Sequence, residues 1–408
     1  MKIRTWNKNQ IKNKKNLEFD ESTYKLSSIE SEEKFIQAQF KTKKELERYN
    51  QYRIEWDRRA IEMDPGSFPL AIICELVSLC NLNCTMCYTT TPEFQNSVIG
   101  TQRMMPWETV TKIIDECAEL GVYSLLLSWR GESTLYKVKD SENNVRDIAD
   151  VFEYARKKNI LEITCLTNGR SIDKYLAKRI VKAQPNWISF SIDGIGEVYN
   201  KIRKSKKKTE ANPFETVVAN IKGINLLKKQ YRSLLPQIRT NTIYPAISKD
   251  LDQYKSFMKS IGVDLLTVNE MLDFRGSEIP EDCIQDNWFC QYVFQRLVIS
   301  ANGTIMPCPG AHNEDSEIAL GRYIGSPVKS VIQKDKQVTF DYSEMNIKQA
   351  WCSKKANTIR NLHSLNNRKE ILTCKYCRHG AKKYGITWIP DDWDMRTMEW
   401  VNRVWKNN

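Results

Sequence analysis

The sequence predicts an α/β protein built around a partial (β/α)6 TIM-like barrel, because runs rich in β-branched residues alternate with amphipathic stretches. The strand runs are LAIICELV, YSLLLSW, LEITCLT, NWISFSI, QIRTNTIY and LLTVNEM, which begin at residues 70, 123, 161, 186, 237 and 265. Strands that alternate with helices form a parallel sheet with right-handed crossovers. Six such units are too few for a closed eight-stranded barrel, so the barrel is expected to be open.

The length of the chain leaves room for further parts on both sides of the barrel. Its 408 residues, 41% of them hydrophobic, suffice for a barrel-sized core and a second, smaller domain. We expect an N-terminal helical arm over residues 1–65, the barrel over 66–280 and a small C-terminal domain over 281–408.

Helix signals support this division. The apolar pattern of residues 31–63 indicates a single helix in the arm, and Pro65-Gly66 follows it as a stop signal. Within the barrel, helices are expected over 106–120 and 213–230. Asn212, directly before Pro213, is a suitable N-cap for the second of these helices.

Charge and hydropathy limit the location and the partners of the protein. No run approaches the roughly 18 apolar residues of a membrane span, and the basic N-terminus lacks the apolar stretch of a secretory signal, so we expect a cytoplasmic protein. The formal net charge of +12 favours anionic partners such as a phosphorylated substrate, a nucleotide, nucleic acid or an acidic electron donor. A lysine-rich solvated surface would explain the charge equally well.

Polar residues follow the predicted strands at the points where the strands end. They are Cys80, Cys84 and Cys87, then WRGE at 129–132, TNG at 167–169, SIDG at 191–194, and Asn269 with Glu270. The carboxyl ends of parallel strands meet at one edge of a barrel, where active sites form. We therefore expect a catalytic site at this edge.

The segment CNLNCTMCY places three cysteines in a C-x3-C-x2-C array, and Tyr88 follows the last one. Such an array could form a disulfide framework, a zinc site or an iron–sulfur cluster with one open iron. A reducing compartment disfavours disulfides, and zinc normally takes four protein ligands. After a first strand, the array resembles the cluster-binding loop of the radical S-adenosylmethionine (radical SAM) superfamily. The resemblance implies a [4Fe–4S] cluster and S-adenosyl-L-methionine, which is cleaved reductively to methionine and a 5′-deoxyadenosyl radical that abstracts a substrate hydrogen.

Further matches to this family occur in the expected order along the chain. Arg130-Gly131-Glu132-Ser133 resembles the Gly-Gly-Glu-Pro motif that contacts the methionine amino group, with its first glycine and its proline replaced. The resemblance implies cofactor-binding roles for Tyr88, Gly131, Glu132, Asn168, Ser191, Asp193 and Arg203.

A second group of cysteines lies in the C-terminal third: Cys290, Cys308, Cys374 and Cys377. Their spacing resembles the auxiliary-cluster region called SPASM in its shortened twitch form, because no cysteine follows Cys377. The resemblance implies one auxiliary [4Fe–4S] cluster; a structural zinc is the alternative. A hairpin with Asn302-Gly303 at its turn is expected to bring Cys308 beside Cys290.

Five cysteines remain outside these two groups. Cys74, Cys117 and Cys165 fall within predicted strands or helices, where cysteine acts as a small buried hydrophobe. Cys283 and Cys352 are candidate catalytic thiols that could donate a hydrogen atom to a substrate radical. Only three histidines are present, which disfavours an imidazole-centred mechanism.

The resemblance implies radical chemistry on a small polar molecule, sugar-like or nucleotide-linked, that ends in oxidation or epimerisation. A flavodoxin or ferredoxin would be a suitable electron donor. One alternative is a peptide maturase that modifies a ribosomally made precursor. Another is a non-catalytic zinc or nucleic-acid-binding protein, although no aromatic and basic platform for single strands is visible.

Overall fold

The structure, a computed structural model, describes residues 23–25, 27–95, 104–206, 212–269, 288–311, 317–326, 330–333, 336–339 and 343–377, and the single positions 281, 284, 286, 314 and 379. The predictions for Cys283 and Glu270 lie outside these residues. Within the described part, no helix is long and apolar enough to cross a membrane.

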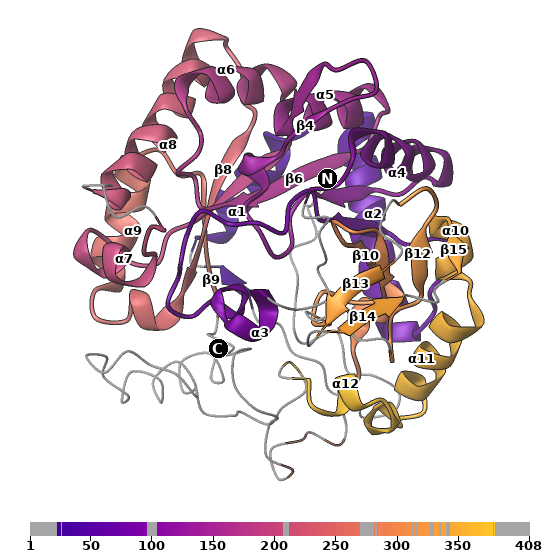
Figure 1. The fold of residues 1–408 in the computed structure, drawn as a ribbon. Helices are drawn as coiled ribbons and strands as arrows, with labels where there is room; N and C mark the ends of the chain where they lie inside the picture. The colour runs from indigo at the N-terminus through magenta and orange to yellow at the C-terminus, as the bar shows by residue number, and fades with distance from the viewer. Residues whose placement is uncertain are drawn as a thin grey trace.

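Six parallel strands form the barrel, as the sequence predicts (Figure 1). They are β2 (Ala71–Cys74), β3 (Ser124–Leu126), β6 (Glu162–Thr167), β7 (Trp187–Ser191), β8 (Gln237–Ile243) and β9 (Leu265–Asn269). Each strand pairs in parallel with the next in this order. Consecutive strands are therefore neighbours in space, and their carboxyl ends meet at one edge.

Helices follow the barrel strands and cover the outer face of the sheet (Figure 1). They are α4 (Trp107–Leu120), α5 (Ile148–Lys157), α6 (Lys174–Ala183), α8 (Pro213–Gln230) and α9 (Leu251–Ser260). The expected cap of α8 is confirmed, since the Asn212 side chain accepts a hydrogen bond from the backbone N–H of Glu215. One face of each strand packs on these helices, so the opposite face looks into the barrel.

Shorter elements decorate the barrel loops. They are η2 (Tyr88–Thr90), α3 (Pro92–Gln95), η3 (Ser133–Leu135), the hairpin of β4 (Lys137–Lys139) and β5 (Val145–Asp147), α7 (Glu197–Ile202) and η4 (Tyr244–Ala246). Most of them lie between a strand and the next helix. They therefore belong to the carboxyl edge, where the site is expected.

The N-terminal arm holds two helices, so the expectation of a single helix over 31–63 is wrong. The helices are α1 (Ile29–Gln37) and α2 (Lys43–Glu62). Thr42 and Glu45 form a capping box that starts a new helix, which explains the break. On α2, Tyr52 and Trp56 pack against Leu70 and Ala71 at the start of β2. The arm therefore packs at the amino ends of the barrel strands. β1 (Thr23–Lys25) instead pairs with the carboxyl half of β9, from Thr267 to Asn269.

The C-terminal part continues the barrel sheet. Its strands are β10 (Arg296–Ile299), β11 (Thr304–Met306), β12 (Gly321–Tyr323) and β15 (Glu344–Met345), with a separate hairpin of β13 (Ser330–Gln333) and β14 (Lys336–Thr339). Its helices are η6 (Gln291–Phe294), α10 (Ile347–Trp351), α11 (Lys354–Ser364), η7 (Arg368–Glu370) and α12 (Leu372–Lys375). β10 pairs in parallel with β2, so this part is joined to the barrel through a shared sheet.

The predicted hairpin at Asn302-Gly303 is confirmed, because β10 and β11 are antiparallel neighbours. Gly303 has φ of +92°, and a Cβ atom there would lie 1.8 Å from Ser326 Oγ. Only glycine fits this turn.

Candidate functional site

The three-cysteine loop leaves the carboxyl end of β2 and is fixed by backbone hydrogen bonds on both sides. On one side, the N–H of Glu132 donates to the carbonyl of Leu79 at 2.8 Å. On the other, the N–H groups of Asn83 and Thr85 donate to carbonyls near the end of α7 at 2.7 and 3.0 Å. Neighbouring elements thus hold the loop in a defined shape.

Burial and neighbouring ionisable groups shift the pKa of two thiols in this loop. Burial, together with the neighbouring thiols, raises the pKa of Cys84 to about 12, although the Arg203 guanidinium opposes the shift. Burial and the Glu132 carboxylate raise the pKa of Cys80 to about 11. Thiolates are the ligands of biological iron–sulfur clusters, so the donor set in this loop fits such a cluster.

Glu132 connects the ends of two strands beside the loop. Its buried carboxylate accepts hydrogen bonds from the N–H of Thr134 at 3.0 Å and from the hydroxyls of Thr134 and Thr167, both at 2.6 Å. The N–H of Asn168 adds a fourth bond at 2.6 Å. The carboxylate is therefore held in one orientation next to Cys80.

Gly131 lies against the chain that leads into the loop. A Cβ atom at this position would lie 2.3 Å from the carbonyl oxygen of Val77 and 2.5 Å from that of Leu79. Real Cβ atoms do not approach backbone atoms so closely. The glycine that the sequence retains is therefore required for packing against the cysteine loop.

Arg130, which stands where the family motif has glycine, joins the barrel to the C-terminal part. Its guanidinium forms ion pairs with Glu75 and Glu314, both at 2.6 Å, and all three side chains are fully buried. Glu314 also accepts a hydrogen bond from the Asn302 side chain at 2.8 Å. Next to it, the indole N–H of Trp129 donates to the carbonyl of Pro309 at 2.9 Å, directly after Cys308.

Asn168 and Arg203 reach the cysteine loop from two other strand ends. The Asn168 side chain donates to Asn81 at 2.8 Å and lies 3.8 Å from Cys80 Sγ. Arg203 pairs with Asp193 at 2.7 Å, and its guanidinium lies 3.9 Å from Cys84 Sγ. The Asp193 carboxylate also accepts the N–H of Ile243 at 2.9 Å, which fixes the pair to β8.

The two remaining predicted cofactor residues also lie near this edge. Tyr88 follows Cys87 and packs edge-on against Phe94, with 5.2 Å between ring centroids. Ser191 is the last residue of β7 and is half-buried. The structure thus brings the predicted cofactor-binding residues to the carboxyl edge around one loop.

The second cysteine group surrounds one small cavity. Cys290, Cys308, Cys374 and Cys377 all line it, together with His363. Burial raises the pKa of Cys374 well above its ordinary value, and the other three thiols raise it further. Among the described residues, no group of three or more His, Cys, Asp or Glu side chains is arranged to hold a single metal ion. The four thiols around one cavity fit the ligand set of an iron–sulfur cluster.

Cys352, one of the two candidate catalytic thiols, lies away from this site. It is exposed after α10, and its Sγ lies 3.8 Å from the carbonyl of Ser67, which precedes β2. The cysteine loop follows the opposite end of the same strand. Cys74, Cys117 and Cys165 are buried, as expected.

The sequence showed no sign of the roles of Glu75 and Glu314, and it indicated Asn302 only as a turn residue, not as a partner of Glu314. Glu75 follows β2 and Glu314 belongs to the C-terminal part, and no motif connects either residue with Arg130. The one available signal was the presence of a charged residue, Arg130, where the motif has glycine.

Comparisons with known proteins agree with this arrangement. The model of the radical SAM superfamily matches residues 75–229, and the model of an iron–sulfur cluster-binding domain, SPASM, matches residues 290–378. A curated relative, Fe-coproporphyrin III synthase of Methanosarcina barkeri, is 29% identical over 142 residues, which are 34% of this chain and 31% of that protein. The chain thus matches less than a third of this relative's length.

Solved structures similar to this one have low sequence identity to it. The structure of anSMEcpe with bound AdoMet has a TM-score of 0.51 and 15% identity, over 82% of this chain and 95% of that one. The complex of BtrN with AdoMet and 2-DOIA has a TM-score of 0.44 and 11% identity, over 78% and 94%. The cysteine loop, the second cysteine group and the two matched domain models together lead to one conclusion: residues 75–229 form a radical SAM domain and residues 290–378 a SPASM domain, so the cofactors are [4Fe–4S] clusters and S-adenosylmethionine.

Proposed function

We propose that the chain oxidises a small polar molecule, sugar-like or nucleotide-linked, by radical SAM chemistry. When bound, the first cluster and S-adenosylmethionine supply a 5′-deoxyadenosyl radical that removes a hydrogen atom from the substrate. Cys80, Cys84 and Cys87 would hold this cluster. Glu132 would bind the methionine ammonium, and Asn168, Ser191 and the Asp193–Arg203 pair would contact the rest of the cofactor.

One observation carries the preference for oxidation. The loop with Gly131 and Glu132 is bonded to the segment that follows Cys308 of the second cysteine group, through Trp129 to Pro309 and through Arg130 to Glu314. Oxidation leaves an electron on the substrate that must be accepted nearby. A cluster held by Cys290, Cys308, Cys374 and Cys377 would be joined to the reaction site by these contacts.

Epimerisation would instead need a thiol that returns a hydrogen atom to the substrate. Outside the two cysteine groups, the thiols in the described part of the chain are Cys74, Cys117, Cys165 and Cys352. The first three are buried, and Cys352 lies beyond the opposite end of β2. Cys283, the other candidate donor, lies outside the described residues, so a Cys283 variant is the test of epimerisation.

The first test is metal analysis of anaerobically reconstituted protein. Two cubane clusters predict about eight irons and about eight sulfides per chain. The triple variant Cys80→Ala/Cys84→Ala/Cys87→Ala should keep about half of the iron. Zinc as the main metal, or full iron retention in the triple variant, would contradict the proposal.

The second test is cofactor cleavage. With a flavodoxin, a ferredoxin or a chemical one-electron reductant, the protein should release methionine and 5′-deoxyadenosine. Glu132→Ala should weaken cofactor binding by about 1.5–3 kcal/mol, because a charge-assisted hydrogen bond is lost. Glu119→Ala, on the exposed surface of α4, serves as the control.

Product mass then identifies the reaction. Oxidation gives a product lighter by two hydrogens, whereas epimerisation in deuterium oxide gives a product of the original composition that carries one deuterium. A Cys283→Ala variant that stops product formation but not cofactor cleavage would support epimerisation. Turnover of a peptide but of no small molecule would favour the maturase alternative.

A further inference from the structure

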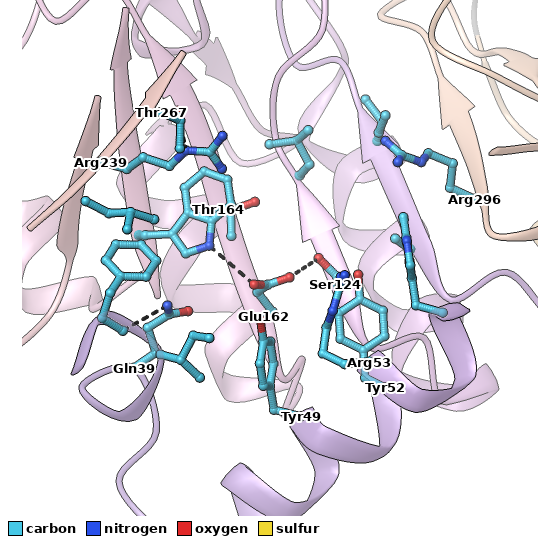
Figure 2. Close-up of a pocket in the computed structure, with 18 of the residues that line it drawn as sticks. Gln39, Tyr49, Tyr52, Arg53, Ser124, Glu162, Thr164, Arg239, Thr267 and Arg296 are labelled. Carbon is cyan, nitrogen blue, oxygen red and sulfur yellow. Dashed lines mark hydrogen bonds between the residues drawn. The ribbon is translucent and has the colours of Figure 1, made fainter. Parts of the chain in front are cut away.

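Inside the barrel lies a cavity of about 430 Å³ whose role the cofactor site does not explain (Figure 2). Inward-facing residues of the strands line it, among them Ser124 on β3, Glu162 on β6 and Arg239 on β8. Residues of α1 and α2 complete the lining at the amino ends of the strands. The volume lies within the range of small-molecule sites.

Three guanidinium groups reach this cavity from three different elements. In Figure 2, Arg239 and Arg296 point into it from opposite sides, and Arg53 extends from α2. Arg296 is on β10, level with Ala71 at the start of β2. The cations are therefore fixed on separate parts of the framework.

None of the three arginines forms an ion pair within the described part of the chain. Arg239 donates from Nε to the hydroxyl of Thr267 at 3.1 Å. Arg296 lies against the rings of Trp56 and Tyr292, 4.9 and 3.9 Å from their centroids, and its buried Nε has no hydrogen-bond partner. Arg53 lies over the ring of Trp56 at 5.3 Å.

The carboxylates that line the cavity attract these cations but are not among their ion-pair partners in the described residues. Glu162 accepts hydrogen bonds from the Ser124 hydroxyl at 2.7 Å and from the Trp187 indole at 3.3 Å. Glu32 is the other carboxylate among the lining residues. Three cations against two anions leave an excess of positive charge and unused N–H donors. Burial accordingly lowers the pKa of Arg239 to about 10.

Such an arrangement is costly unless something compensates for it. The three arginines are half-buried, and a partly desolvated charge without an ion-pair partner destabilises a fold. Guanidinium groups pair best with the oxygens of carboxylates and phosphates. Side-chain hydroxyls that face the same space, from Thr164 and Thr267, add further polar contacts. The cavity is therefore complementary to a polar molecule with an anionic group.

The position of the cavity suits a substrate. β6 runs for six residues from Glu162 to Thr167, next to Asn168 at the cofactor edge. At about 3.3 Å per residue, the two ends lie about 17 Å apart. Leu166 also lines the cavity, which therefore extends to within two residues of Asn168.

We propose that this cavity binds the substrate, and that Arg239, Arg296 and Arg53 hold an oxyanion of that substrate, either a phosphate or a carboxylate. The inference rests on the proposed function and names the class of its substrate. α1 and α2 line the deep end of the cavity, so the N-terminal arm forms part of the substrate site.

Calorimetric titration of the reconstituted protein with S-adenosylmethionine tests this proposal. The probes are inorganic phosphate, glucose 6-phosphate and glucuronate, with glucose as the neutral match. We expect at least one anionic probe to bind and glucose to bind much more weakly. Tighter binding of glucose 6-phosphate would indicate a phosphate site, and tighter binding of glucuronate a carboxylate site.

Substitutions of the cavity arginines test whether the anionic probe binds in this cavity. Arg239→Gln and Arg296→Gln should each weaken the binding of the anionic probe about 10- to 100-fold, because charge-assisted hydrogen bonds are lost. Arg239→Lys, which keeps the charge, should restore part of the affinity. Arg48→Gln, on the same helix as Arg53 but outside the cavity, should bind like the unaltered protein.

Binding of none of the anions, or equal binding by the Gln variants, would overturn the proposal. Cofactor cleavage without substrate separates this outcome from a failure of the proposed function. The variants leave Glu132 and the cysteine loop unaltered, so release of 5′-deoxyadenosine should persist in them.

Discussion

Arginines lie at the carboxyl end of the barrel and inside it, in different electrostatic situations: Arg130 is buried, whereas Arg239 and Arg296 are half-buried. At the carboxyl end, Arg130 is enclosed by Glu75 and Glu314 and is fully compensated. Within the barrel, Arg239 and Arg296 face a cavity without an ion-pair partner in the described residues. A compensated charge fixes two parts of a protein together, whereas an uncompensated one is available to a ligand. The comparison separates structural from ligand-binding cations in one molecule.

The largest expected effect tests the compensated end. Arg130→Met would leave two buried glutamates without a cation, and should lower the free energy of unfolding by about 3–5 kcal/mol. Arg146→Met is the control, because its pair with Asp140 is about a third exposed on the arginine side and should contribute less than about 1 kcal/mol. Denaturant titration of both variants measures the difference. Equal stability of the two would contradict the structural role of Arg130.

A smaller effect is expected for Gly131→Ala, which tests whether packing as well as charge fixes the carboxyl end of the barrel. Gly131→Ala introduces a Cβ atom that overlaps the carbonyls of Val77 and Leu79, so the cysteine loop must shift at a cost of about 1–3 kcal/mol. We expect less iron to be incorporated at the site of Cys80, Cys84 and Cys87. Gly223→Ala on α8 is the matched control, because nothing lies within 4 Å of its added Cβ. Unchanged iron content in Gly131→Ala would show that the loop tolerates the shift.

The smallest effect tests the uncompensated arginine. Without ligand, Arg239→Gln should change the free energy of unfolding by less than about 1 kcal/mol, since the substitution removes a desolvated charge together with one hydrogen bond. Denaturant titration without and with an anion measures this change in the free energy of unfolding. A loss as large as that of Arg130→Met would mean that Arg239 also has a structural partner.

The placement of motifs at the carboxyl end of the barrel could be predicted from the sequence, because each motif directly follows a strand in the chain. The cysteine loop, the Arg130–Ser133 tetrapeptide and Asn168 each follow a strand that is recognisable from its own residues, and the parallel order brings them together. The cap of α8 at Asn212 is equally local. Such features need only neighbouring residues to be recognised.

The amino end could not be predicted in the same way. Arg239 on β8 and Arg296 on β10 are single residues that belong to no motif, and their common cavity depends on barrel closure and on the docking of α2. The pairing of Arg130 with Glu314 depends likewise on how the C-terminal part folds back. Tertiary placement, which no short pattern encodes, determines both.

The pairing of β10 with β2 has a consequence for the order of assembly. β2 is the first barrel strand to leave the ribosome, and its outer neighbour β10 follows only after the rest of the barrel has been synthesised. Until then, the edge of β2 has unpaired N–H and C=O groups that can recruit a strand from another chain. A nascent or truncated chain that stops before β10 is therefore the species most prone to aggregate.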